Sequence, residues 1–300
     1  MRSAEAPPDG CLPVRNSARI SSVPCLSAGW LDLRRMSQRR SALWPRVRTR
    51  RARGTLQTIP QVESAELGNQ RDLVVWVPPG YSRSDRRYSV IYMHDGQNLF
   101  DPRASFADPW RVDLALTRVG KPVHEAIVVA IPNMGTERIN EYSPFVDAKA
   151  GGGKGDQYLD WILGTVKPLV DANFKTRPDR AHTGMIGSSM GGLITLYAYL
   201  RDPSAFGFIG VLSPSLWFAG RSIFSTLAES PHVPGGRIYL DIGAREGKVA
   251  LDDARRMRDA LVEKGYALGR ELKWVEDPKG RHTEVDWGRR LGDALPFLLK

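Results

Sequence analysis

Short apolar runs alternate along most of the chain with segments whose apolar residues recur every three or four positions. The short runs predict strands at 71–77, 89–94, 126–131, 182–187, 206–212, 237–242 and 271–275. The segments of helical periodicity are 110–119, 157–173, 192–201, 250–264 and a last one from about residue 283. Strands that alternate with helices are typical of a parallel sheet covered on both faces. The pattern therefore predicts one doubly wound, mainly parallel α/β domain over residues 54–300.

Three local features refine this picture. Residues 126–131 form a near-continuous apolar run, which indicates a strand buried on both faces. Pro168 lies inside the helix predicted at 157–173 and predicts a kink there. Residues 133–156 form a long polar connection.

The turn between the strand 182–187 and the helix 192–201 has the sequence Gly187-Ser-Ser-Met-Gly191. This is the G-x-S-x-G pattern of the nucleophile elbow in α/β-hydrolases, which exposes a serine on a sharp turn. Glycines on either side avoid a clash of Cβ atoms, and the N-terminus of the following helix favours negative charge. The pattern predicts Ser189 as a nucleophile. The alternative is a glycine-rich turn around a buried serine.

A serine hydrolase of this fold needs an acid and then a histidine after the serine in the chain. Of the five histidines, only His232 and His282 follow Ser189. His232 lies in a loop before a strand. His282 follows the strand 271–275, at the carboxyl edge where such folds build their sites. We predict His282 as the catalytic base; the alternative is an exposed loop histidine that caps the last helix.

The acid should lie in the loop after the strand 237–242, and Glu246 is four residues beyond that strand. A carboxylate there would hold the imidazole in the required tautomer and stabilise its protonated form. Asp241 comes too early, at the strand edge. Asp252 and Asp253 open the next helix, where an acid is favourable in any case, and Asp253 is the reserve choice.

Two backbone N–H groups are expected to stabilise the oxyanion of the reaction. One belongs to Met190, directly after the nucleophile, and the other to Gln97, in the loop after the strand 89–94. Gly96 allows the backbone of this loop to approach closely. Taken alone, Asp95-Gly96 is also an ordinary turn.

The charge of the chain is concentrated at one end. The 300 residues are 42% hydrophobic and 25% charged, as in ordinary globular proteins, and the net charge is +10. Residues 1–53 contain twelve arginines, no lysine and three acids, while the rest contains 31 basic and 30 acidic side chains. The folded domain is therefore nearly neutral, which argues against a nucleic-acid-binding surface on it.

Residues 1–53 lack apolar periodicity and contain five prolines, so we expect a disordered extension. It could also be spurious, with translation starting downstream, for which Met36 is a candidate. No apolar segment follows Arg39-Arg40 or Arg50-Arg51, which excludes a twin-arginine signal. An organellar transit peptide and a tail that contacts membrane or RNA are the alternatives.

Both cysteines, Cys11 and Cys25, lie in this extension, so the domain cannot use a disulfide, a cysteine nucleophile or a cysteine-bound zinc. We expect no membrane span, because no apolar window is long enough to form one. The expected location is the cytoplasm. The segment 151–155 lacks the spacing of a phosphate loop, and His94-Asp95 lacks that of a metal site. No cofactor and no metal are predicted.

Several motifs make residues from about 54 to 300 similar to the esterase D-like "putative esterase" family of α/β-hydrolases. The motifs are Tyr92-Met-His-Asp-Gly-Gln-Asn-Leu-Phe-Asp101, Arg138-Ile-Asn-Glu-Tyr-Ser-Pro144, Gly187-Ser-Ser-Met-Gly-Gly192, Ser213-Pro-Ser-Leu-Trp217, Asp241-Ile-Gly-Ala-Arg-Glu246 and Gly280-Arg-His282 with Trp287. They are closest to the bacterial enterochelin-esterase-like branch. The resemblance implies the nucleophile at Ser189, the base at His282 and the acid at Glu246, a position that varies within the family. Residues 1–53 match nothing in it.

The resemblance also implies that four aromatic residues near the carboxyl edge could line an acyl pocket, although plain packing explains each equally well. They are Phe100, Trp110, Tyr142 and Trp217. We therefore expect a cofactor-free serine carboxylester hydrolase that acts on a small-molecule ester of siderophore, feruloyl or acetyl type. An acyltransferase that uses the same acyl-enzyme and a non-catalytic binding scaffold are the alternatives.

Overall fold

The predicted parallel sheet is present in the computed structural model, which describes residues 46–47, 54–106, 108–119 and 125–300. Within these residues, nine strands form one sheet in the order β1-β2-β3-β5-β4-β8-β9-β10-β11. From β5 to β11 all neighbouring strands run parallel, and β1, β2 and β3 add an antiparallel edge. The sheet is thus mainly parallel and confirms the predicted fold class.

The strands are β1 Arg46–Val47, β2 Thr55–Ser64, β3 Asn69–Val77, β4 Ser89–Met93, β5 Ala126–Ala130, β8 Thr183–Ser188, β9 Phe208–Leu212, β10 Arg237–Gly243 and β11 Leu272–Asp277, with a separate hairpin of β6 Val146–Asp147 and β7 Gly151–Gly152. The helices are α2 Val112–Val119, α3 Arg138–Glu141, α4 Gly155–Trp161, α5 Lys167–Asn173, α6 Met190–Arg201, α7 Phe218–Arg221, α8 Ile223–Glu229, α9 Lys248–Glu263 and α10 Glu284–Leu298.

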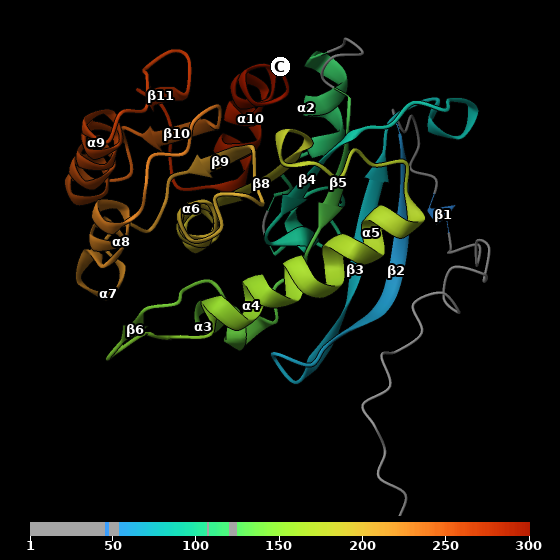
Figure 1. Ribbon diagram of the computed structural model, residues 1–300, viewed down its shortest axis with the longest axis horizontal. Coiled ribbons are helices and arrows are strands. Elements are labelled where there is room, and N and C mark those ends of the chain that lie inside the picture. Colours follow the sequence, from blue (N-terminus) through green and yellow to red (C-terminus); the bar gives the residue numbers. More distant parts are fainter. Residues whose placement is uncertain (1–45, 48–53, 107, 120–124) are drawn as a thin grey trace, which may run out of the picture. The chain divides into compact units, whose positions relative to one another are not determined.

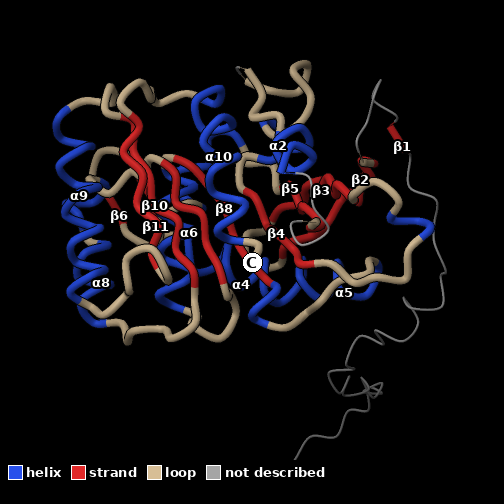
Figure 2. The backbone as a smooth tube through the Cα atoms, turned by 90° about the horizontal axis from the view of Figure 1, so that it is seen from above, coloured by secondary structure: helices blue, strands red, loops and turns tan. Residues whose placement is uncertain are grey.

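Helices cover both faces of the sheet and enclose two apolar cores. The helices α2 and α10 lie on one face, whereas α4, α5, α6, α8 and α9 pack on the other (Figure 1). Seen from above, the sheet strands run between these helices (Figure 2). Alternate residues of a strand serve the two cores: in β5, Ile127 and Val129 face the first, and Val128 and Ala130 the second. All five residues of β5 are buried, as its continuous apolar run predicts.

Two elements differ from the sequence predictions for local reasons. The strand β2 was not predicted, because Pro60 interrupts its apolar pattern and Gln61 has a φ of 50° where the pairing with β3 shifts register. The helix predicted at 157–173 is present, but a π-helical turn at Ile162–Val166 joins α4 to α5. This turn ends just before Lys167, so Pro168 falls in the first turn of α5, where its missing N–H matters little.

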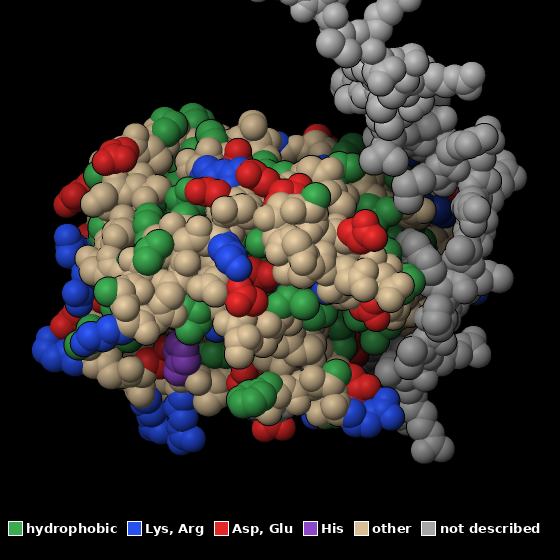
Figure 3. All heavy atoms as spheres, turned by 90° about the horizontal axis from the view of Figure 1, so that it is seen from below, with side chains coloured by type: hydrophobic (Ala, Val, Ile, Leu, Met, Phe, Trp, Pro, Cys, Tyr) green, Lys and Arg blue, Asp and Glu red, His purple; other side chains and the backbone are tan. Residues whose placement is uncertain are grey.

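The prediction for residues 1–53 falls outside the described part of the chain, apart from the backbone of β1, which pairs with β2. On the face of the domain seen in Figure 3, acidic side chains lie among the basic ones, as the near-neutral composition leads one to expect. Within the described ranges, no helix combines the length and the apolar character that a membrane crossing needs.

Candidate active site

Ser189 occupies the turn between β8 and α6. Its backbone angles, φ 58° and ψ −123°, lie in a sparsely populated region that costs a non-glycine residue about 1–3 kcal/mol. The neighbouring glycines make this turn possible. A Cβ on Gly187 would lie 2.4 Å from the carbonyl oxygen of Gly191, and one on Gly191 would lie 3.2 Å from the Cβ of His94. The strained turn presents the Ser189 hydroxyl at the carboxyl end of β8.

His282 lies in the loop between β11 and α10 and contacts Ser189. Its Nε2 is 2.9 Å from Ser189 Oγ, and its Nδ1 is 2.7 Å from Oε2 of Glu246. Because a carboxylate can only accept, Nδ1 carries the proton and Nε2 accepts a hydrogen bond from the serine hydroxyl. The Trp287 indole meets the imidazole edge-on, with 4.8 Å between ring centroids. Since 45% of the His282 side chain is exposed, the site is open to solvent.

Glu246 is buried behind His282, with 1% of its side chain exposed. Its Oε1 accepts hydrogen bonds from Oγ of Ser213 at 2.6 Å and from the N–H of Gly243 at 2.8 Å. Burial raises the pKa of Glu246, but the hydrogen bonds from His282 and Ser213 outweigh it and hold the pKa below its ordinary value. The carboxylate is therefore charged at neutral pH.

The other candidate acids have different partners. Asp253, the reserve choice, accepts a hydrogen bond from Nε of Arg221 at 2.7 Å. Asp241 is fully buried and bonds to Nε of Arg290 at 3.0 Å. Burial raises the pKa of Asp241 to about 7, and the positive charge of Arg290 opposes that rise. Of the three carboxylates, Glu246 is the one that reaches His282.

The turn predicted to carry the second oxyanion donor packs against the end of β5. It is a short 3-10 turn, Gly96–Asn98, and the N–H of Gly96 donates to the carbonyl oxygen of Ile131 at 2.8 Å. In the described part of the chain, the amide N–H groups of Met190 and Gln97 donate to no backbone carbonyl. Within these residues, neither amide therefore has a backbone acceptor that would compete with a bound oxyanion.

Substituting Gly96 by alanine should move this turn. A Cβ at Gly96 would lie 2.7 Å from backbone atoms of Ala130 and Ile131, which cannot move aside as a flexible side chain could. We expect Gly96→Ala to lower kcat about 10²-fold, the scale of losing one oxyanion donor. Gly292→Ala is the matched control, because a Cβ there meets nothing within 4 Å. A folded Gly96→Ala protein with unchanged kcat in an ester-hydrolysis assay would contradict the assignment of Gln97.

Asp95 links the 3-10 turn Gly96–Asn98 to the polar connection that follows β5. Its backbone has a φ of 52°, and its carboxylate accepts two hydrogen bonds from Arg138, at 2.7 and 2.8 Å, and one from Nδ2 of Asn133 at 2.6 Å. The adjacent His94 is buried, which lowers its pKa to about 4, so the ring is neutral. Its Nδ1 is 2.9 Å from the hydroxyl of Tyr158. His94 and Asp95 thus support the turn.

The Asp95–Arg138 pair should make stability depend on pH. Burial raises the pKa of Asp95, but Arg138 outweighs it and lowers the pKa below its ordinary value. The charged carboxylate therefore stabilises the fold at pH 7, and this contribution is lost as pH falls below about 4. Asp95→Asn, whose side chain tolerates positive φ, should lose about 1–3 kcal/mol at pH 7. Urea unfolding at pH 7 and at about pH 3.5 checks this; an equal loss at both pH values contradicts it.

The four predicted pocket aromatics differ in exposure. Tyr142 is 0% exposed, and its hydroxyl accepts a hydrogen bond from the N–H of Asp95 at 3.0 Å. Trp110 is 4% exposed and packs against Trp287, with 5.8 Å between ring centroids. These two side chains are therefore packed inside the protein and do not line an open pocket. Phe100 is half-buried and Trp217 is 50% exposed, so both retain surface for a ligand.

Four residues to which the sequence predictions assign no function complete the surroundings of the proposed site, although three of them stand in motifs of the family resemblance. Ser215 Oγ is 3.2 Å from Ser189 Oγ, Ser213 and Arg290 contact Oε1 of Glu246, and the indole N–H of Trp287 donates to Oγ of Ser213. One signal was available, because Ser213 directly follows an apolar strand and so had to lie at the carboxyl edge. The roles of Arg290 and Trp287 depend on contacts across the fold, which their positions on a helix do not reveal.

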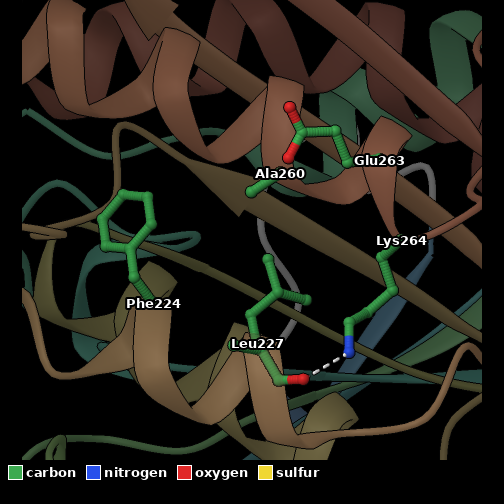
Figure 4. Close-up of a pocket in the computed structure, with 6 residues that line it drawn as sticks. Phe224, Leu227, Ala260, Glu263 and Lys264 are labelled. Atoms are coloured by element: carbon green, nitrogen blue, oxygen red, sulfur yellow. Dashed lines mark hydrogen bonds between the residues drawn. The ribbon is translucent and has the colours of Figure 1, made fainter.

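A groove of about 270 Å³ lies between α8 and α9, away from these residues. Phe224 and Leu227 face Ala260 across it, and Lys264 donates to the carbonyl oxygen of Ala228 at 2.9 Å (Figure 4). None of the predicted site residues lines this groove. Among the described residues, no group of three or more His, Cys, Asp or Glu side chains is arranged to hold a metal ion.

The sheet, its helices and the position of Ser189 define an α/β-hydrolase, and comparisons with solved structures agree. An IroE-like serine hydrolase from Shewanella oneidensis is similar with a TM-score of 0.65 at 22% identity, over 80% of this chain and 78% of that one. The enterobactin esterase FES from Shigella flexneri has a TM-score of 0.64 at 22% identity, over 84% of this chain and 60% of that one. At this identity the similarity shows the fold.

The family follows from the sequence comparisons. Residues 64–298 match the family model described as "Putative esterase", and the chain belongs to this family. The Bacillus subtilis protein YbbA is 30% identical over 78% of this chain and 94% of its own length. A siderophore enterobactin esterase from Emericella nidulans is 36% identical over 51% of this chain and 54% of its own. The protein is thus a carboxylic ester hydrolase.

Proposed function

We propose that this esterase works through a catalytic triad of Ser189, His282 and Glu246 and a covalent acyl-enzyme. The observation that carries the proposal is the continuous hydrogen-bond chain, 2.9 Å from Ser189 Oγ to His282 Nε2 and 2.7 Å from His282 Nδ1 to Glu246 Oε2. A serine hydroxyl is a weak nucleophile until an adjacent base can take its proton. The strained turn and the two amides near it fit the same chemistry.

The reaction has two matched halves. Ser189 Oγ attacks the ester carbonyl carbon while its proton passes to His282 Nε2, and the amides of Met190 and Gln97 donate to the resulting oxyanion. The intermediate collapses, the alcohol leaves with the proton from His282, and the acyl group stays on Ser189. Water then gives a proton to His282 and attacks the acyl carbon. The carboxylic acid leaves as the serine regains its proton.

The first test of this proposal is covalent labelling of the full chain with a fluorophosphonate probe, which reacts with activated serines. Peptide mapping should find the label on Ser189. A folded protein without label would favour the alternative of a binding scaffold. Product analysis with added alcohol acceptors separates the two activities by how the acyl group divides between water and the acceptor: a transferase forms mostly the new ester at acceptor concentrations far below that of water, whereas a hydrolase forms mostly the acid.

The substrate class is suggested by the relatives. One is a siderophore enterobactin esterase, and another is an endo-1,4-beta-xylanase/feruloyl esterase from Xylanibacter ruminicola, 26% identical over 79% of this chain and 30% of its own length. We infer an ester of an aromatic acid or a siderophore lactone, which the half-exposed Trp217 could contact. A panel of a siderophore trilactone, a feruloyl ester and an acetylated sugar tests this. A preference for the acetylated sugar contradicts it.

A further inference from the structure

Ser213, the residue after β9, is 1% exposed and lies between the triad acid and two buried donors. Its Oγ is 2.6 Å from Glu246 Oε1, 3.0 Å from Trp287 Nε1 and 2.6 Å from Nη2 of Arg290. Indole and guanidinium nitrogens can only donate hydrogen bonds, whereas a charged carboxylate can only accept them. The Ser213 hydroxyl must therefore accept hydrogen bonds from two of its partners and donate one to the third.

Counting donors and acceptors fixes the direction of the Ser213 proton. A serine hydroxyl donates one hydrogen bond and accepts two. Trp287 and Arg290 fill both acceptor positions, so the proton is left for Glu246. The N–H of Gly243 donates to the same Oε1 at 2.8 Å. Nη2 of Arg290 reaches the same oxygen at 3.5 Å. With Oε1 held by these donors, Oε2 is the oxygen that faces His282.

The donors themselves are fixed by the fold. Arg290 is 1% exposed, and its Nε donates to Oδ2 of Asp241 at 3.0 Å. The other oxygen of Asp241 accepts the N–H of Ser213 at 3.1 Å, which closes a ring of three residues. Ser213 also has a φ of 42°, a value that glycine adopts more easily than serine. A glycine at this position would avoid the strain of the backbone but would lack the hydroxyl.

We propose that Ser213 is a positioning residue for the triad acid: its hydroxyl, oriented by Trp287 and Arg290, holds Glu246 with Oε2 toward His282. The inference rests on the proposed triad and adds to it a residue that touches no substrate. Without the hydroxyl, Oε1 keeps the N–H of Gly243 and the longer contact with Arg290 but loses its shortest hydrogen bond, so the carboxylate and the imidazole are held less firmly. Chemistry should then slow while substrate binding is retained.

The test compares Ser213→Gly, Ser213→Ala and Ser213→Cys in the full chain. Glycine suits the backbone at φ 42°, so Ser213→Gly removes the hydroxyl without adding strain. We expect kcat for p-nitrophenyl butyrate to fall about 10–10²-fold in the Gly and Ala variants, with KM changed by less than about 3-fold. The Cys variant, with its weaker S–H donor, should lie between them and the parent. In proton NMR, the downfield signal of the His282 Nδ1–H should lose intensity in the same order: it should be strongest in the parent, weaker in the Cys variant and weakest in the Gly and Ala variants.

Ser64→Ala is the matched control, because Ser64 is also buried and its hydroxyl donates to a carboxylate, Glu66 Oε2 at 3.3 Å. It should leave kcat and the resonance unchanged. A folded Ser213→Gly protein with parental kcat overturns the proposal, and so does a loss in the Ala variant that glycine restores. If the Gly variant does not fold, parental kcat in the Ala and Cys variants overturns it. If Ser189→Ala keeps its activity, the proposed triad is wrong. If Ser189→Ala is inactive but the Ser213 variants keep the parental kcat, only the role of Ser213 is rejected.

Discussion

Replacing Ser189 by alanine is expected to lower kcat for p-nitrophenyl butyrate hydrolysis by about 10⁵-fold or more. Without Oγ no acyl-enzyme can form, and His282 has no serine proton to take. The amides of Met190 and Gln97 remain, so a small rate above that of water should persist. Steady-state kinetics on the full chain, at enzyme concentrations high enough to detect the residual rate, measure this loss.

The same substitution should leave the fold intact. Alanine and serine have the same difficulty at φ 58°, so the strain of the turn does not change. The denaturation midpoint should stay close to that of the parent, which excludes unfolding as the cause of inactivity. His282→Ala should be as inactive as Ser189→Ala, and the double variant no worse, because the two residues act as a unit. A rate for Ser189→Ala within about 10-fold of the parent would reject the nucleophile.

The fold, and the residues of the proposed triad that the structure brings together, could be predicted because their signals lie in short segments and in chain order. The strand-turn-helix around Ser189 shows in one short segment, since the turn needs glycine on both sides. Chain order then left two histidines, and the loop after β10 offered Glu246. The strand β2 was not predicted for two reasons. Its own sequence contains Pro60, which interrupts a strand pattern, and its pairing with β3 passes through a bulge that the sequence does not reveal.

The surroundings of the site could not be predicted because they depend on distant contacts. Ser213 meets Arg290 across 77 positions of the chain, and Tyr142 meets Asp95 across 47. An aromatic residue near the carboxyl edge can face a ligand or the core, and only packing decides which. Tyr142 and Trp110 proved to be core residues, whereas the exposed Trp217 is still a candidate for substrate contact.

Glutamine at position 246 should lower kcat about 10³–10⁴-fold, because an amide can donate to Nδ1 of His282 and favour the wrong tautomer. The side chain keeps its size, so the buried position remains filled. Asp253→Asn is the matched control: Asp253 lies on the following helix and pairs with Arg221. It should leave kcat within about 3-fold of the parent. The reverse pattern, with Asp253→Asn inactive and Glu246→Gln active, would make Asp253 the acid.

The charge state of Glu246 follows from its environment. Hydrogen bonds from His282 and Ser213 outweigh the effect of burial and keep its pKa below the ordinary value. The parent carboxylate therefore stays charged on lowering the pH through about 4.3, the usual pKa of glutamate. The carbon-13 NMR resonance of the Glu246 carboxyl carbon should thus show no protonation shift from pH 8 to about pH 5 and titrate only at lower pH. A protonation shift that already begins near pH 6 would mean that Glu246 is protonated there, contrary to the hydrogen bonds that hold it charged.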